Sequence, residues 1–200
     1  IDTLDSDYLR YYFASKLSTG VDDIDLNLDE FKQKCNSDLV NKYANIASRS
    51  ARFINKNFDN SLSERLDSPE LIEEFKNASQ KVADHYEKLE FSKAQKEIML
   101  LADKANQYVD SKQPWVLIKD KGNEELVQSI CTTSLNLFRI LTIMLQPVIP
   151  GFVEKSLRFL KEDKIEWNSI NKTLLNCKID NFEAIVTRID DGHLDKLIGN

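Results

Sequence analysis

Residues 135–145 read Leu-Asn-Leu-Phe-Arg-Ile-Leu-Thr-Ile-Met-Leu, and this stretch decides the fold. Its apolar side chains fall on nearly every side of a helix, so we expect a helix that is buried all round. The helical pattern begins after Lys121-Gly122-Asn123 and runs to Gln146, where Pro147 and Pro150 end it. A helix buried on all sides needs other helices around it, and the stretch therefore predicts a helical bundle.

Apolar residues at helical spacing predict further helices around this central one. The expected helices cover residues 5–17, 29–58, 68–86, 92–112 and 152–160, with weaker candidates at 182–189 and 194–198. Thr19-Gly20 should end the first helix, Ser68-Pro69 should begin the third, and Gln113-Pro114 should interrupt the fourth. Residues 21–28 alternate in polarity and should be extended or irregular up to Asn27, a candidate helix cap.

The composition favours helices throughout the chain. Among 200 residues there are only 5 glycines and 4 prolines, and 42% of the residues are hydrophobic, enough for a core. We therefore expect an all-α fold, an antiparallel helix bundle with an N-terminal connecting segment and a C-terminal tail. Because the chain opens at Ile1 rather than at a methionine, we also expect it to be part of a longer protein.

The net charge of −6 is distributed unevenly along the chain. Residues 1–30 contain eight acidic and two basic side chains, whereas residues 31–66 contain seven basic and three acidic ones. An acidic protein is a poor candidate for coating nucleic acid non-specifically, since that binding needs many cations on phosphates. A local basic face suits a selective contact with an anion, and we expect no general affinity for DNA.

Cysteine usage and hydropathy point to the cytoplasm. Cys35, Cys131 and Cys177 are odd in number and far apart, so neither a disulfide framework nor a zinc site is indicated. We expect reduced thiols that are partly buried. No apolar run approaches the length of a membrane span and no signal peptide precedes the first helix, so we expect no membrane partner.

Catalytic signals are missing from the sequence. His85 and His193 have no partner that spacing could propose, and no phosphate-binding glycine motif or metal-ligand spacing occurs. Adjacent acidic residues such as Asp22-Asp23 diverge on a regular element, so they indicate solvated surface. We expect no catalytic residue, no metal and no cofactor in this chain.

Asn45 and Arg49 lie one turn apart on the polar side of the expected helix 29–58. That spacing places an amide beside a guanidinium on one face. Such a pair can hydrogen-bond the edge of an unstacked base and neutralise a phosphate. The alternative is a solvated helix face with Arg49 in an ordinary surface ion pair, and side-chain chemistry alone favours it.

Gln113-Pro114-Trp115 places an indole directly after a break in a helix. Proline fixes the local backbone, so Trp115 should sit on a rigid corner and could serve as a stacking platform for a base. The alternative is that Trp115 packs in the core beside Val116 and Ile118. We expect Trp167, in the irregular tail, to be a packing residue.

A series of segments, in order along most of the chain, carries a family resemblance. They are Asp7-Tyr8-Leu9-Arg10-Tyr11-Tyr12, Lys16-Leu17, Asp22-Asp23-Ile24-Asp25-Leu26-Asn27, Asn36-Ser37-Asp38-Leu39-Val40-Asn41-Lys42, Asn45-Ile46-Ala47-Ser48-Arg49, Ala105-Asn106-Gln107-Tyr108-Val109-Asp110, Gln113-Pro114-Trp115 and Leu145-Gln146-Pro147-Val148-Ile149-Pro150. Any one of them is weak evidence, but jointly they resemble methionyl-tRNA synthetases of the bacterial, enteric-like form.

The resemblance implies that residues 1–28 form a connecting segment that packs under a catalytic domain. It implies a helical anticodon-binding domain at residues 29–162 and a tail at residues 163–200 that folds back toward the catalytic domain. The family's own catalytic and ATP-binding motifs and its zinc-bearing insertion do not occur here. The chain alone should therefore not aminoacylate, and ATP and zinc would belong to other domains of the parent enzyme.

The resemblance also implies what the candidate surface recognises. In the family, an Asn and an Arg one turn apart and a Trp preceded by Pro read the CAU anticodon of methionine tRNA, with the Trp stacking near the first base. The positions that match are Asn45, Arg49, Pro114 and Trp115. Two alternatives remain open: a helical scaffold that docks a partner protein through Trp115, and the anticodon domain of a related class I synthetase.

Overall fold

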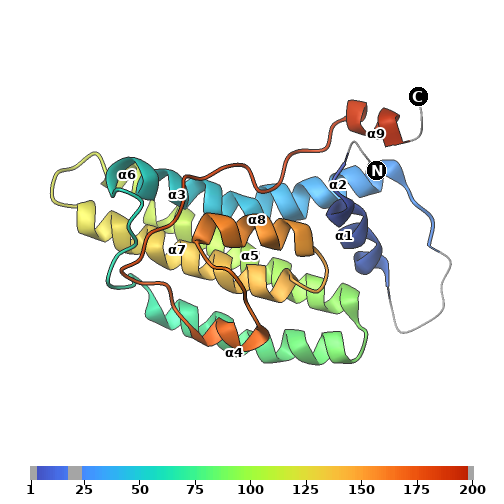
Figure 1. The fold of residues 1–200 in the computed structure, drawn as a ribbon, viewed down its shortest axis with the longest axis horizontal. Coiled ribbons are helices and arrows are strands. Elements are labelled where there is room, and N and C mark those ends of the chain that lie inside the picture. The colour runs from blue at the N-terminus through green and yellow to red at the C-terminus, as the bar shows by residue number, and fades with distance from the viewer. Residues whose placement is uncertain (1–3, 18–23, 198–200) are drawn as a thin grey trace.

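A computed structural model describes residues 4–17 and 24–197 of the chain (Figure 1). Within these ranges the regular structure is helical, apart from one isolated antiparallel bridge between Ser61 and Lys178. The α-helices are α1 (Ser6–Lys16), α2 (Leu28–Cys35), α3 (Asn45–Asn57), α4 (Pro69–Glu87), α5 (Phe91–Lys112), α6 (Pro114–Leu117), α7 (Glu124–Leu145), α8 (Pro150–Leu160) and α9 (Asp191–Leu197). A π-helical segment, η1 (Asn36–Ala44), joins α2 to α3, and a short 3₁₀ helix, η2 (Trp167–Asn171), follows α8.

The bundle is built from α3, α4, α5 and α7, and side-chain pairs give the direction of each helix. Ser50 Oγ donates to Ser134 Oγ and the Tyr43 hydroxyl bonds Thr142, so α3 and the preceding η1 run antiparallel to α7. Two ion pairs, Lys81–Glu97 and Glu74–Lys104, join α4 to α5 and show that these helices are also antiparallel. The predicted all-α bundle is thereby confirmed, with the predicted bounds of its helices correct to within a few residues.

Helix α7 is the central element, as the stretch 135–145 predicts. Every residue from Ser129 to Leu145 is buried, including Arg139 and Asn136. By length and composition alone α7 could cross a membrane, with a mean hydropathy of 1.3, so the expectation that no apolar run reaches such a length is wrong. In the 18-residue stretch of α7 that is this apolar, 89% is buried inside the fold, so the apolar character of the helix reflects its position in the core.

The predicted helix 29–58 is continuous in space, but its middle is a π-helix. The segment η1 (Asn36–Ala44) is anchored from both sides: Asn36 exchanges two hydrogen bonds with the backbone of Ile189, and Asp38 accepts one from the Tyr11 hydroxyl at 2.8 Å. A π segment fits the same apolar stripe with a wider turn, so spacing alone does not reveal it. It ends at Ala44, directly before Asn45.

The C-terminal tail is irregular where residues 182–189 were predicted to be a short helix, and that prediction is wrong. Backbone amides in this segment are already bound to side chains of the N-terminal half. Asn55 Oδ1 accepts from Phe182 N, the Tyr8 hydroxyl from Thr187 N, and Asn36 Oδ1 from Ile189 N. These bonds replace the i to i−4 bonds that a helix needs. The second candidate is present as α9 (Asp191–Leu197), although Ile198 lies outside the described residues.

Two ends of the molecule can be distinguished in Figure 1. Helices α1, α2 and α9 gather at one end, and α6 with the following loop lies at the other. At the first end, Asp5 caps α1, and Asn27 caps α2 as predicted. The predicted stop at Thr19-Gly20 lies outside the described residues, whereas the expected irregular segment is observed from residue 24 to Asn27.

Candidate nucleic-acid interface

Three side-chain contacts at matching intervals join the η1–α3 helix to α5. Lys42 Nζ lies 2.7 Å from Asp103 Oδ2, Asn45 Nδ2 donates to Asn106 Oδ1 at 2.9 Å, and Arg49 Nη2 lies 2.5 Å from Asp110 Oδ1. The residue numbers of the contacting partners rise together on both helices, so the two helices run parallel here and in register. The polar face on which Asn45 and Arg49 were predicted to lie is therefore shared with α5.

Arg49 lies between a carboxylate and an indole. Its guanidinium carbon is 4.7 Å from the ring centroid of Trp115, within the range of a cation–π contact, while Nη2 bonds Asp110. The Arg49 side chain is 26% exposed and the Asp110 side chain 60% exposed, so the pair faces solvent. The surface ion pair that the alternative interpretation expects for Arg49 is thus present, and it holds the guanidinium over the indole of Trp115.

The amide of Asn45 has a defined orientation. Asn106 Nδ2 donates to the backbone oxygens of Lys42 (3.0 Å) and Ala102 (2.9 Å). The atom of Asn106 that faces Asn45 is therefore Oδ1, which accepts a hydrogen bond from Asn45 Nδ2. Within the described part of the chain, Asn45 Oδ1 has no hydrogen-bond donor. Asn45 therefore offers an acceptor and a second N–H to a ligand.

A left-handed residue fixes the corner that carries Trp115. Gln113 has a φ of 47° and ψ of 56°, which ends α5 and starts α6 at Pro114. Pro114 is buried, and Trp115 is partly buried against the hydrophobic core. The corner lies where the sequence predicts it, and the packing that the alternative interpretation expects is also observed in part, so the indole is only partly accessible to a ligand.

The structure brings Asn45, Arg49 and Trp115 together at the surface, with Pro114 buried beneath the corner that carries Trp115. Sequence reasoning missed Asn106 and Asp110, which orient Asn45 and Arg49. The available signal was their own spacing, since an Asn and an Asp four residues apart on a helix mirror the Asn–Arg pair on the other helix.

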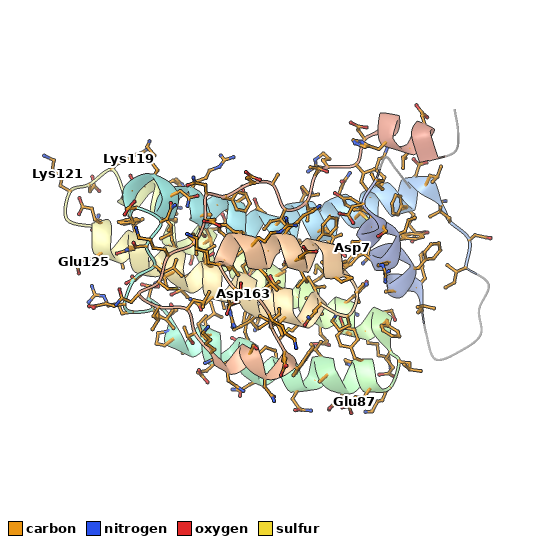
Figure 2. The ribbon with its side chains drawn as sticks, viewed as in Figure 1. Asp7, Glu87, Lys119, Lys121, Glu125 and Asp163 are labelled. Atoms are coloured by element: carbon orange, nitrogen blue, oxygen red, sulfur yellow. The ribbon has the colours of Figure 1, made fainter. Side chains whose placement is uncertain are left out.

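Further cations lie at the same end of the bundle. Lys119 and Lys121 project outward from the loop after α6, as Figure 2 shows. Within the described residues neither forms an ion pair, and Glu125 at the start of α7 pairs with Arg65. The exposed carboxylates Asp120, Glu124 and Glu125 lie on the same loop and helix start, so these two lysines do not give this end a net positive charge.

Metal-ligating side chains do not cluster in the described ranges, 4–17 and 24–197. No group of three or more His, Cys, Asp or Glu side chains there could hold a metal ion. His85 pairs with Glu90, and burial raises the pKa of both Cys35 and Cys131 to about 12, which makes these thiols unreactive.

Comparison with known proteins gives consistent matches. Residues 62–190 match the family described as "Anticodon binding domain of methionyl tRNA ligase", and residues 1–51 match "tRNA synthetases class I (M)". The chain is 46% identical over 198 residues to a methionine–tRNA ligase of Francisella tularensis subsp. tularensis, covering 99% of the chain and 29% of that relative. The chain thus spans less than a third of the length of the curated relatives it matches.

Solved structures show the same fold. Apo methionyl-tRNA synthetase of Mycobacterium tuberculosis superposes with a TM-score of 0.88 at 21% identity, covering 94% of this chain and 40% of that one. The same organism's enzyme in complex with methionyl-adenylate gives a TM-score of 0.85 at 22% identity, over 92% of this chain and 38% of that one. With more than half of its residues in the family match, the chain belongs to the family of anticodon-binding domains of methionyl tRNA ligase.

Proposed function

We propose that this domain reads the CAU anticodon of methionine tRNA through Asn45, Arg49, Pro114 and Trp115. The observation that carries the proposal is that the side chains of Arg49, Trp115 and Asn45 lie together. Arg49 lies 4.7 Å over the indole of Trp115, and one helical turn away Asn45 presents an oriented amide. An aromatic platform, a guanidinium and an amide on one rigid surface form the set that recognises an unstacked base.

On this proposal, a bound base takes the place of the Arg49 guanidinium on the indole of Trp115. Stacking of a base on an aromatic side chain contributes about 1–3 kcal/mol. The guanidinium–indole contact contributes about 0.5–1 kcal/mol at an exposed site. Replacing Arg49 with a base on Trp115 is therefore favourable, and the displaced guanidinium becomes available to the edge of the base or to a phosphate.

Base identity is then read by the polar groups. Stacking alone tolerates any base, because every base has a π face. Asn45 presents an acceptor and an N–H on a fixed amide, and cytosine offers the complementary donor and acceptor on its Watson–Crick edge. On this proposal Asn45 and Arg49 select cytosine as the first anticodon base, and Asn106 and Asp110 act as positioning residues.

The wider assignment concerns the parent enzyme. We propose that residues 1–28 connect to a catalytic domain, residues 29–162 form the anticodon-reading unit, and residues 163–200 form a tail that returns toward that catalytic domain. The parent would attach methionine to its tRNA with ATP in the cytoplasm. In support, α1 and α9 lie together at the end opposite α6, and Lys32 of α2 forms an ion pair with Asp191 of α9.

The experiment that tests the proposal separates tRNA charging from amino-acid activation in the full-length ligase. Trp115→Ala and Arg49→Ala should lower the kcat/KM for tRNA by about tenfold or more, since each removes about 1.4 kcal/mol or more of RNA binding. Methionine-dependent ATP–pyrophosphate exchange should stay unchanged, because no ATP site is involved. Normal charging by both variants would contradict the proposal.

One alternative is a helical scaffold that docks a protein through Trp115. The partial burial of Trp115 and the guanidinium over its face leave little apolar area for such a contact. The scaffold alternative predicts that the two variants lose a protein partner and charge tRNA normally, so the same experiment distinguishes the two functions. The family match to methionyl tRNA ligase favours this synthetase over the other class I enzymes.

A further inference from the structure

A groove runs beside the candidate site, between α3 and the C-terminal tail. It consists of two hollows of 460 Å³ and 580 Å³ that share Ser48, Phe182 and Ala184, so they are continuous. Each has the size of a ligand site, roughly 300–1,000 Å³. Asn45 lines the first hollow, which connects the groove directly to the residues of the proposed function.

The wall on the tail side is held firmly against α3. Asn55 Nδ2 donates to Asp180 O at 3.1 Å, and Asn55 Oδ1 accepts from Phe182 N at 3.0 Å. The Phe182 ring also packs edge to face against Phe159, with ring centroids 5.2 Å apart. The groove is therefore a built feature of the fold, fixed by side chains on both sides.

The lining of the groove is cationic in a chain whose net charge is −6. Arg52 and Lys56 line the second hollow and Arg188 lines the first, and no carboxylate lines either. Arg52 and Lys56 are exposed, and in the described part of the chain neither forms an ion pair. Unpaired cations in a groove without carboxylates favour an anionic ligand.

The two sides of α3 differ in charge, which orients that ligand. On the α5 side the carboxylates Asp103 and Asp110 are paired with Lys42 and Arg49, so that side carries no net charge. On the tail side lie Arg52 and Lys56, which form no ion pair among the described residues. A nucleic-acid strand with its bases over Trp115 gains no net attraction for its phosphates toward α5, because each carboxylate there already neutralises a cation. Its phosphates are attracted toward the groove instead.

We propose that this groove holds the phosphodiester backbone of the RNA strand adjoining the base on Trp115, with Arg52 and Lys56 each contacting a phosphate. At about 1.5 Å of rise per residue, Lys56 lies about 6 Å beyond Arg52 along α3, so the two cations can hold separate phosphates. The inference rests on the proposed function for the position of the strand. Arg52 and Lys56 supply affinity that does not depend on the anticodon sequence.

The test is the salt dependence of stem-loop binding by the 200-residue chain, measured by fluorescence anisotropy. The double variant Arg52→Gln/Lys56→Gln should bind a CAU stem-loop about tenfold or more weakly. The slope of log K against log salt should fall in magnitude by about 1.4, or about 0.7 for each phosphate that the variant no longer neutralises. A stem-loop with a changed anticodon should lose affinity by the same factor.

A matched control removes two exposed cations at the far end of the bundle. Lys88 and Lys96 lie at the α4–α5 turn and the start of α5, and neither forms an ion pair within the described ranges. Lys88→Gln/Lys96→Gln makes the same change in net charge and should leave the slope nearly unchanged. Circular dichroism melting curves verify that both variants are folded.

Two results would overturn the inference. One is an unchanged slope and affinity in the groove variant, which would leave the groove to another anionic partner such as an acidic peptide. The other is a loss confined to the CAU stem-loop, which would make these cations base readers. Failure of the proposed function is a separate outcome, because it appears as equal affinity of the wild-type chain for all anticodons.

Discussion

Arg49 takes part in two contacts that need a planar cation. The guanidinium lies over Trp115 and at the same time bonds Asp110. A lysine at this position would keep the charge but lose the flat surface and the fork of donors. We predict that Arg49→Lys binds a CAU stem-loop about tenfold more weakly than wild type, as measured by anisotropy. Full affinity of the lysine variant would show that charge alone is needed.

Asn106 should affect recognition without contacting the RNA. Its amide fixes Asn45 through one hydrogen bond and is itself fixed by two backbone oxygens. In Asn106→Ala the Asn45 amide is free to rotate, so the preference for cytosine over uracil at the first anticodon position should fall. The salt slope should stay the same, because no phosphate contact is removed. A variant with wild-type preference would remove Asn106 from the recognition mechanism.

The sequence predicted some of the residues that share the site but not all of them. Asn45 and Arg49 lie one turn apart on a single helix, so their proximity follows from helical geometry. Asn106 and Asp110 meet them across two helices, and that contact depends on the parallel register of α3 and α5. No local pattern determines such a register, since it results from packing against α7.

Helix α7 is tied to the tail by a buried ion pair. Arg139, 1% exposed, bonds both carboxylate oxygens of Glu162 at 2.5 and 3.0 Å and donates to the backbone oxygens of Ser169 and Lys172. In the sequence Arg139 interrupts an apolar stretch without any sign of its partner. Its role depends on a tail that the helical pattern does not describe.

Removing one partner of this pair should destabilise the protein strongly. We predict that Arg139→Met lowers the free energy of unfolding by about 3 kcal/mol or more, because the buried Glu162 loses its two short hydrogen bonds and keeps only the exposed Lys172, at 3.3 Å, as a cation partner. Urea denaturation followed by circular dichroism measures the change. The double variant Arg139→Met/Glu162→Leu should recover part of the loss. Equal stability of Arg139→Met and wild type would mean that the pair is not buried in solution.

Asp67 links the start of α4 to α5 in a pH-dependent way. Burial alone raises the pKa of Asp67, but hydrogen bonds from Lys112, Tyr108 and Ser68 outweigh it and hold the pKa below its ordinary value. Because the folded pKa lies below the unfolded one, the carboxylate adds stability above the unfolded pKa of about 3.9 and loses it as the pH falls through the folded value.

We therefore predict that Asp67→Asn lowers the free energy of unfolding at pH 7. The difference from wild type should shrink as the pH falls below about 4. Urea titrations at a series of pH values measure this difference. A difference that stays constant across the series would mean that the charge of Asp67 does not contribute, and that packing alone accounts for the loss.

At the level of elements, apolar spacing predicted most of the fold. The long helices have strong periodic patterns and clear ends, such as Pro69 for α4 and Pro114 for α5. The two failures have a common cause. The π turn of η1 and the irregular segment 182–189 are both stabilised by groups distant in sequence. These are the Tyr11 hydroxyl and the Ile189 backbone for the first, and the side chains of Asn55 and Tyr8 for the second.

At the scale of the whole molecule, the proposed binding surface and the proposed connection to a catalytic domain lie at opposite ends. The candidate site and α6 lie at one end of the bundle, and α1, α2 and α9 at the other (Figure 1). On the proposed function, the acidic residues of α1 and α2 lie away from the RNA and the basic groove lies beside it. This separation lets an acidic protein bind a polyanion at one place, in agreement with the charge pattern of the sequence.

The central claim is that this domain distinguishes the CAU anticodon. The most direct test titrates the 200-residue chain with a CAU stem-loop and with the same stem-loop carrying UAU. We predict that CAU binds tighter by about tenfold or more, and that Trp115→Ala weakens both while Asn45→Ala removes the preference. Equal affinity of the wild-type chain for the two stem-loops would contradict the claim.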